Sequence, residues 1–244
     1  MKAIVYHKYG SPDVLALEEV EKPTPRDDEV LVAVHSASVN SWDWDLLRGK
    51  PFLARVTAGG LLTPKHGILG TDIAGRVETV GKDVKRLKPG DEVFGELSWR
   101  FLSLGFGGFA EYACAREYSM MPKPAGMTFD EAASLPQVGA LALGALRYNG
   151  QVQPGQKVII NGAGGGVGTL AVQIAKSYGA EVTGVDSAEK LDTVRTLGAD
   201  HVIDYTREDF TRNGLLYDLI IDVAAYRSTL TWRHTVQRLI TNVP

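Results

Sequence analysis

The pattern of apolar and polar positions changes about halfway along the chain. Up to about residue 118 the strand-like runs are short, several with an apolar residue at every second position, and lie at residues 2–6, 29–40, 72–81, 91–97 and 109–115. This period indicates strands that bury one face, and turn residues such as Lys88-Pro89-Gly90-Asp91 separate the runs. Short strands at such intervals predict a small β-barrel.

From residue 130 the apolar positions follow the helical period instead. We predict one helix over residues 130–149, with Asp130 and Glu131 placing negative charge in its first turn. Beyond it, strands alternate with helices, the strands at 157–161, 181–185, 201–203 and 218–222 and the helices at 166–178 and 188–197. Apolar strands connected by crossover helices predict an α/β fold with a doubly wound parallel sheet.

The two patterns meet at the proline-rich segment Met121-Pro122-Lys123-Pro124. Clustered prolines are typical of a connection between structural units, because proline cannot continue a helix or an interior strand. We therefore expect a barrel domain over residues 1–122 and a parallel-sheet domain over residues 123–244.

Residues 157–176, KVIINGAGGGVGTLAVQIAK, join a short apolar strand, a glycine-rich turn and an amphipathic helix. Glycines leave no Cβ to obstruct a pyrophosphate, and the amide N–H groups at a helix N-terminus bind phosphate oxygens. The spacing is A-x-G-x-x-G, with an alanine in place of the usual first glycine. The segment predicts a dinucleotide-binding loop rather than a flexible connection, formed by Ala163, Gly164, Gly165, Gly166, Val167 and Gly168.

The second apolar strand of this region ends at Asp186. A carboxylate at that point accepts hydrogen bonds from the adenosine ribose in dinucleotide-binding domains. The alternative is local, because an aspartate followed by Ser187 at a strand end also serves to cap the next helix.

Composition excludes several classes of partner. The chain is 44% hydrophobic and 23% charged, with a formal net charge of −3, and its basic residues do not form a long run. Nucleic acid and membrane surfaces are therefore not expected partners, and with neither a signal segment nor a membrane span we expect a cytoplasmic protein. The single cysteine, Cys114, excludes an intrachain disulfide and a multi-cysteine zinc site, and we expect it to be a buried apolar residue.

Several longer strings carry a family resemblance: MKAIVYHKYGSPDVL, SVNSWDW, LGTDIAGRVETVG, LKPGDEVFG, GGFAEYA, PGQKVIINGAGGGVGTLAVQIAK and LGADHVIDY. With the barrel before the glycine loop, they resemble the medium-chain dehydrogenase/reductase superfamily, and specifically its zinc-free quinone oxidoreductase branch. The resemblance extends to about Ser228. It implies a GroES-like β-barrel domain and a Rossmann domain, with NAD(P)H bound between them and hydride delivered to a quinone, enone or carbonyl substrate.

The resemblance and the residues together argue against zinc. Zinc alcohol dehydrogenases of this superfamily bind the catalytic metal through a cysteine and a His-Glu pair, where this chain has Val39-Asn40-Ser41 and Gly70-Thr71-Asp72. Amide and hydroxyl groups are poor zinc ligands, and residues 96–108 contain no cysteine for a structural zinc. We expect the protein to work without metal.

Catalytic roles are implied by the segment SVNSWDWD. In relatives its asparagine and aspartate lie beside the nicotinamide, which assigns Asn40 to donate to the acceptor oxygen and Asp43 to orient it or relay a proton. Alternatively, both bond their own backbone in a turn. Trp42 and Trp44 either line a pocket for a flat apolar acceptor or belong to the core. Asp72 is expected to stabilise the turn that contains it.

The sequence supports arguments for both NAD and NADP as the preferred coenzyme. Asp186 repels a 2′-phosphate and favours NAD, whereas Ser187, Lys190 and Tyr205 match positions that hold this phosphate in NADP-binding relatives. The resemblance as a whole favours NADP. Lys190 has the alternative of being an ordinary solvated helix lysine.

The chain departs from the family pattern in two places. Leu141 stands where relatives carry a threonine that contacts the nicotinamide-side ribose, and relatives continue well beyond Pro244. We expect residues 229–244 not to form a buried strand, which leaves the Rossmann sheet incomplete and strand 218–222 at its edge. A homodimer is one alternative for the assembly, because relatives dimerise through a sheet edge.

These departures leave two classes of function open. The first is an NAD(P)H-dependent, zinc-free reductase of quinones, enones or carbonyl compounds. The second is a catalytically silent dinucleotide-binding protein of the same lineage. A zinc alcohol dehydrogenase is a third alternative, which the missing cysteines oppose.

Overall fold

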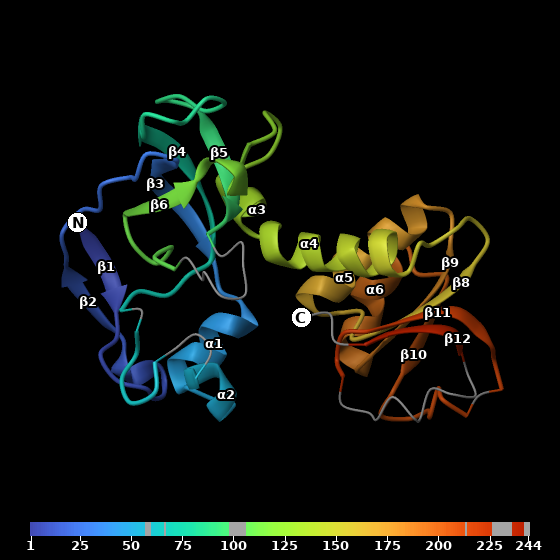
Figure 1. Ribbon diagram of the computed structural model, residues 1–244. Coiled ribbons are helices and arrows are strands. Elements are labelled where there is room, and N and C mark those ends of the chain that lie inside the picture. The colour runs from blue at the N-terminus through green and yellow to red at the C-terminus, as the bar shows by residue number, and fades with distance from the viewer. Residues whose placement is uncertain (57–59, 66, 98–105, 213, 226–235, 242–244) are drawn as a thin grey trace. The chain divides into compact units, whose positions relative to one another are not determined.

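The computed structural model describes residues 1–56, 60–65, 67–97, 106–212 and 214–225, together with the backbone of residues 236–241 (Figure 1). The chain divides into two units, Met1–Gln137 and Val138–Pro244. The division lies later than the proline-rich segment around Pro122, because the residues that follow this segment pack on the sheet of the first unit.

The first unit is built on antiparallel strands. Five form one sheet in the order β6-β3-β4-β5-β7, and two form a hairpin that joins the chain near residues 68 and 110 through isolated bridges. The strands are β1 (Lys2–Val5), β2 (Ala16–Glu19), β3 (Glu29–Ser38), β4 (Asp72–Val80), β5 (Glu92–Glu96), β6 (Tyr112–Arg116) and β7 (Met120–Pro122). All five predicted runs form strands. The apolar pattern did not predict β2, which is mostly polar, or β7, which has three residues, because neither strand has a clear alternation of apolar and polar residues.

Alternation along these strands produces the core of the unit. On β3, Val30 and Val32 are buried, and Ile73 and Val77 on β4 and Val93 on β5 pack in the same cluster. The helices of the unit are α1 (Ser41–Arg48), α2 (Phe52–Ala54) and α3 (Phe129–Ala133), with short 3₁₀ helices at Pro12–Val14 and Glu117–Ser119.

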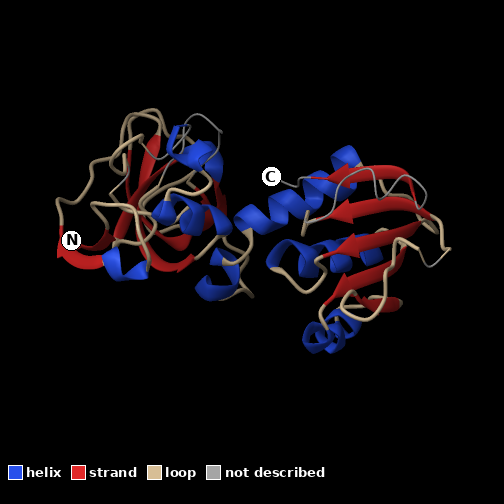
Figure 2. Cartoon of the chain, turned by 90° about the horizontal axis from the view of Figure 1, so that it is seen from below, coloured by secondary structure: helices blue, strands red, loops and turns tan. Residues whose placement is uncertain are grey.

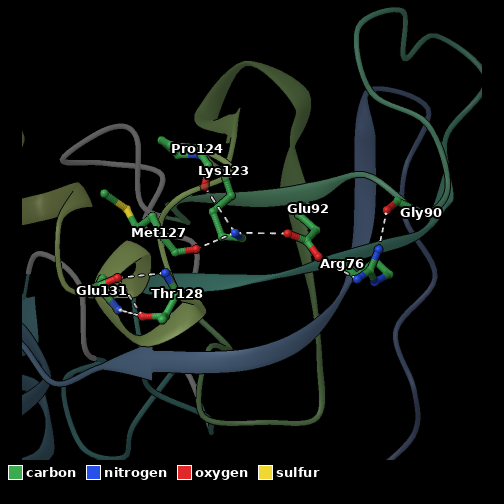
Figure 3. A network of polar contacts seen from close by, with 8 residues as sticks. All are labelled: Arg76, Gly90, Glu92, Lys123, Pro124, Met127, Thr128 and Glu131. Carbon is green, nitrogen blue, oxygen red and sulfur yellow. Dashed lines mark hydrogen bonds and ion pairs between the residues drawn. The ribbon is translucent and has the colours of Figure 1, made fainter.

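A polar network fixes α3 to the sheet of the first unit (Figure 3). The Lys123 side chain is only 5% exposed, and its Nζ lies 3.1 Å from Glu92 Oε2 on β5 and donates to the Met127 carbonyl at 2.6 Å. Glu92 also pairs with Arg76 on β4 at 2.6 Å. Thr128 caps α3 in a reciprocal capping box with its third residue. These bonds explain why the first unit extends beyond the proline-rich segment.

The single helix predicted over residues 130–149 is wrong. α3 ends at Ala133, α4 occupies Pro136–Leu143, and a π-helical segment, Gly144–Asn149, follows. Pro136 explains the break, because a proline has no N–H to donate and disfavours the helical conformation of the residue before it. The negative charge predicted for the first turn is present on α3.

The second unit is a five-stranded parallel sheet, whose strands lie side by side in Figure 2. Its order, β10-β9-β8-β11-β12, is that of a doubly wound sheet that reverses between β8 and β11. The elements are β8 (Lys157–Asn161), α5 (Gly166–Ser177), β9 (Glu181–Asp186), a 3₁₀ turn (Ala188–Lys190), α6 (Leu191–Thr196), β10 (His201–Asp204), β11 (Tyr217–Asp222) and β12 (Val236–Thr241). Among the described residues, no helix is long and apolar enough to span a membrane.

The expectation that strand 218–222 forms an edge is corrected by β12. β12 pairs in parallel with β11, from Tyr217 opposite Val236 to Asp222 opposite Thr241. An outer strand has a single neighbour, so it tolerates polar positions that an interior parallel strand does not, and the sequence VQRLIT is rich in β-branched residues. The apolar run expected of an interior strand was therefore the wrong criterion for this segment.

Helix α5 covers one face of the parallel sheet. Ala171, Val172 and Ala175 pack against Val158 and Ile160 of β8, in a cluster that also takes in the neighbouring strands. This contact fixes the N-terminus of α5 at the carboxyl end of β8.

Candidate functional site

The glycine loop between β8 and α5 has most of its amide groups engaged within the protein. The Gly162 N–H donates to the Val185 carbonyl at 2.9 Å, and the Gly165 N–H donates to the Gly162 carbonyl at 3.1 Å. The first intrahelical bond of α5 runs from the Thr169 N–H to the Gly165 carbonyl at 2.9 Å. The amides between them, in the first turn of α5, are the donors left for a ligand. The part of the loop with amides available to a ligand is thus its second half, residues 166–168.

Two glycines of this loop have different structural roles. A Cβ at Gly168 would lie 2.0 Å from the Gly162 carbonyl oxygen, so only glycine allows α5 to approach the loop this closely. A Cβ at Gly165 would meet nothing nearer than 3.4 Å. The space in front of Gly165 is open, and the loop offers the uncovered backbone that a diphosphate requires.

Asp186, at the end of β9, holds the glycine loop. The residue is 6% exposed, and its Oδ2 accepts the Gly164 N–H at 2.7 Å while its Oδ1 accepts the Ser187 N–H at 2.8 Å. The following 3₁₀ turn has no side-chain cap. The local alternative of a helix cap is therefore not what the structure shows, because the carboxylate joins the end of β9 to the glycine loop instead.

A cavity of about 440 Å³ lies beside this carboxylate, within the second unit. Lys190 and Tyr205 line it, as the NADP-type pattern predicts, and the Lys190 Nζ lies 3.6 Å from Asp186 Oδ1. Lys190 is therefore paired rather than simply solvated. Its full lining is Asn161, Gly162, Gly165, Val185, Asp186, Lys190, Tyr205, Phe210, Val223 and Ala224.

Sequence reasoning missed the part of the cavity that follows β8 and β11. Asn161 is the last residue of β8, and Val223 and Ala224 come directly after β11. The signal was present, because ligands of open parallel sheets bind beyond the carboxyl ends of the strands where the strand order reverses. Among the predicted residues, Ala163, Gly164, Gly166, Val167, Gly168 and Ser187 do not line the cavity.

In the first unit, Asn40 is the N-cap residue of α1 and directs its amide toward two hydroxyl groups. Its Nδ2 lies 3.3 Å from Ser38 Oγ and 3.3 Å from Thr71 Oγ1. Asn40 and Thr71, which belong to the two segments compared above with the metal-binding segments of zinc alcohol dehydrogenases, are therefore in contact with each other. Within the part of the chain that the structure describes, no group of three or more histidine, cysteine, aspartate or glutamate side chains is placed to hold a metal ion.

Asp43 is buried and bonded to backbone amides on both sides. Its Oδ2 accepts the Asn40 N–H and its Oδ1 accepts the Gly70 N–H, each at 2.8 Å. Burial raises the pKa of Asp43, and these two amides oppose the rise. This geometry matches the local alternative for Asp43, a clamp between the start of α1 and the loop before β4, and its proposed proton relay stays a prediction.

Asp72 does not stabilise its own turn, contrary to expectation. It is 0% exposed, and its Oδ2 accepts the Gln137 N–H from the first turn of α4 at 2.9 Å. Its Oδ1 has no hydrogen-bond partner among the described residues. Burial raises the pKa of Asp72 to about 7, and nearby Glu96 and Asp43 add to the rise. The turn itself is held by Asp43.

The tryptophans of α1 differ in environment. Trp44 is 44% exposed, with the Arg48 guanidinium 4.9 Å from its ring centre, whereas Trp42 is half-buried. Trp44 is therefore not a core residue. Further exposed apolar side chains follow on and after α2, namely Phe52, Leu53, Val56, Leu61 and Leu62.

Cys114 is half-buried rather than buried, and burial raises the pKa of its thiol to about 11.

Comparisons with known proteins agree with this architecture. The family model of the alcohol dehydrogenase GroES-like domain matches residues 26–125, and that of the zinc-binding dehydrogenases matches residues 166–232. The predicted fold class, a GroES-like domain with a Rossmann-like parallel sheet, is confirmed.

Curated relatives and a solved structure are similar over nearly the whole chain. An NADPH-dependent alkenal/one oxidoreductase of Arabidopsis thaliana is 39% identical over 91% of this chain, and a chloroplastic quinone-oxidoreductase of Triphysaria versicolor is 36% identical over 95%. The chain spans 57% of the first relative and 70% of the second. The structure of the quinone oxidoreductase from Coxiella burnetii superposes with a TM-score of 0.81 at 35% identity, over 91% of this chain and 68% of that one.

Proposed function

Because this chain belongs to the quinone oxidoreductase branch of the medium-chain dehydrogenase/reductase superfamily, we propose that it reduces quinones, enones or carbonyl compounds with a nicotinamide coenzyme. One observation carries the proposal. The open first turn of α5 lies beside a strand-end carboxylate, which together provide the donors and the acceptor that a dinucleotide needs.

The residues of the chain have defined tasks in this proposal. A bound reduced nicotinamide supplies the hydride. The amides of residues 166–168 bind the pyrophosphate, and Asp186 accepts from the adenosine ribose, since a carboxylate has more lone pairs than its two backbone donors occupy. Asn40 donates to the acceptor oxygen, as the resemblance implies. The exposed apolar side chains of Trp44 and of the α2 region favour a flat, apolar acceptor.

We further propose that NADH is preferred over NADPH. The Asp186 carboxylate lines the cavity at the strand end that receives the adenosine ribose in such domains, and Lys190, which lines the same cavity, is already paired with it at 3.6 Å. A phosphate there meets a buried negative charge that Lys190 only partly offsets. This outweighs the preference for NADP that the resemblance alone gives.

The Asp186→Ser variant tests this preference. We expect it to improve the affinity for NADPH relative to NADH by about tenfold or more, because one like-charge contact is removed and Lys190 is released to pair with the phosphate. Equilibrium titration with each coenzyme, followed by nicotinamide fluorescence, measures the ratio. An unchanged ratio, or a wild-type preference for NADPH, contradicts the assignment of Asp186.

Zinc independence is part of the same proposal. It rests on the Asn40–Thr71 contact, in which an amide and a hydroxyl stand in place of metal ligands. Activity that survives dialysis against a chelator supports it. Tightly bound stoichiometric zinc, with loss of activity on chelation, would instead indicate a zinc alcohol dehydrogenase.

Turnover is the decisive experiment. Loss of the absorbance of reduced nicotinamide in the presence of a naphthoquinone, an alkenal or a simple ketone measures the activity and ranks the acceptor classes. Coenzyme binding without consumption of any acceptor would overturn the reductase assignment. It would support the second function, a catalytically silent dinucleotide-binding protein, for a chain that spans little more than half of some relatives.

A further inference from the structure

Two polar side chains meet at the point where the parallel sheet reverses its strand order. Asn161 ends β8 and Asp222 ends β11, and the Asn161 Nδ2 donates to Asp222 Oδ1 at 2.8 Å. Asp222 is fully buried, whereas Asn161 is 7% exposed and lines the cavity beside the glycine loop. The pair therefore has a buried member and a member that faces the cavity.

The buried member fixes the orientation of the other. Asp222 Oδ1 also accepts the Ala225 N–H at 3.0 Å, so this oxygen acts as an acceptor. Asn161 must consequently turn its NH₂ group toward Asp222, because its carbonyl oxygen has nothing to donate. The Asn161 Oδ1 is left as the outward group, and among the described residues it has no hydrogen-bond partner. At this position the cavity is therefore lined by a hydrogen-bond acceptor and not by a donor.

The position along the cavity indicates what this acceptor meets. A dinucleotide on such a sheet crosses the carboxyl ends of the strands, with its adenosine ribose at the second strand of the order and its pyrophosphate at the first helix. Here these are the end of β9, at Asp186, and the N-terminus of α5. Asn161 lies beyond them on the side of β11, where the second ribose follows the pyrophosphate. A ribose hydroxyl is a donor, which matches an outward carbonyl oxygen.

We propose that Asn161, held in this orientation by Asp222, accepts a hydrogen bond from a hydroxyl of the nicotinamide-side ribose. The assignment rests on the proposed coenzyme function. It makes Asn161 a coenzyme-binding residue and Asp222 its positioning residue. It also supplies a ribose contact in place of the threonine that the resemblance implies for relatives at the position of Leu141.

Ligand fragments locate the contact without any need for turnover. ADP-ribose carries both riboses, whereas ADP carries only the adenosine ribose. We expect Asn161→Ala to weaken ADP-ribose and NADH by about three- to tenfold, the range for one neutral hydrogen bond, and to leave ADP within about twofold. Titration calorimetry measures all three ligands. An equal loss for ADP, or no loss for ADP-ribose, overturns the assignment.

A second variant tests the role of Asp222 in positioning Asn161. Asp222→Asn keeps the shape of the side chain but lets it donate, so Asn161 is free to reverse and present its NH₂ group to the cavity. We expect the same selective loss of ADP-ribose affinity, although Asp222 does not line the cavity. Unchanged ADP-ribose affinity in a variant that melts like the wild type would contradict the orientation argument.

A surface control and the wild type separate the possible failures. Asn149→Ala changes an exposed asparagine of the same unit and is expected to bind all three ligands like the wild type. If the wild-type protein binds neither ADP nor ADP-ribose, the proposed coenzyme function fails. If it binds both and Asn161→Ala changes neither, only the present inference fails.

Discussion

Asp43 and Asp72 are two buried carboxyl groups of one unit that differ in their hydrogen-bond partners and in the charges near them. Both oxygens of Asp43 accept a backbone amide, whereas Asp72 has one amide on Oδ2 and no partner for Oδ1 within the described residues. Desolvation opposes ionisation of both, and each backbone donor opposes that effect. The pKa of Asp72 therefore rises to about 7. This difference is invisible in the sequence, because it depends on which distant amides reach each side chain.

Asp72 predicts a specific pH dependence of stability. Its folded pKa of about 7 lies above the ordinary value of 3.8, so the folded protein retains a proton that the unfolded chain releases. The stability associated with the protonated form is complete below the unfolded pKa and is lost as the pH rises through about 7. Besides Asp72, the groups that face this position are Glu96, Asp43, the Asn40 amide and the Gln137 N–H.

We expect Asp72→Asn to remove this dependence. The stability of the variant relative to the wild type should rise between about pH 5 and about pH 8, by on the order of a few kcal/mol, because the variant never buries the charge. Denaturant unfolding at the two pH values measures the change. Asp83→Asn, at an exposed position, serves as the control and should show no such trend. A difference that is constant with pH would contradict the shifted pKa.

At the scale of elements, the glycine loop and α5 form one continuous motif in which nearby glycines have separate roles. Gly168 is needed for packing, since its Cβ would lie 2.0 Å from a backbone oxygen, whereas Gly165 faces open space. Sequence spacing identifies the motif but does not distinguish these functions.

Substitutions at Gly168 and Gly165 should therefore affect different properties, stability in the first case and coenzyme affinity in the second. Gly168→Ala is expected to destabilise the second unit by about 1–3 kcal/mol through overpacking. Gly165→Asp is expected to melt near the wild type and to lose more than about tenfold in NADH affinity, because a carboxylate meets the phosphates. Thermal melting and NADH titration of both variants test the contrast. Unchanged affinity in Gly165→Asp would count against the loop as the phosphate site.

The sequence pattern failed at two elements, the outer strand β12 and the break before α4. The apolar runs of β8, β9 and β11 identify interior parallel strands directly, because burial on both faces demands them. This criterion did not identify β12, which pairs with a single strand, β11, among the described residues. The break before α4 depends on Pro136, a single residue that an apolar period does not register.

For the whole molecule, the two units have separate hydrophobic cores. The first is centred on Val30, Val32 and Ile73, and the second on Val158, Ile160 and the apolar face of α5. Each core is made of residues from its own unit. The units therefore have the means to unfold as separate cooperative transitions.

ADP should stabilise one of these transitions selectively. Because its predicted contacts all lie in the second unit, ADP at about one hundred times its dissociation constant is expected to raise the stability of that unit by about 2.7 kcal/mol. Scanning calorimetry of the full chain with and without ADP measures the shift. Selective protection of residues 157–161 and 217–222 in hydrogen exchange identifies the stabilised unit. A shift of every transition, or of none, would contradict the location of the site.

The sequence by itself determined the two-part organisation, the glycine loop and the carboxylate at the end of β9. These features are local, since strand period, turn chemistry and loop spacing are all properties of neighbouring residues. Only the tertiary structure decided that Asp43 clamps a turn, that Asp72 is left with an unpartnered oxygen, and that Asn161 is oriented by Asp222. The contacts of Asp43 with Gly70, Asp72 with Gln137 and Asn161 with Asp222 join residues that are 27, 65 and 61 positions apart in the chain. Whether a buried polar group finds a donor depends on where folding places that donor.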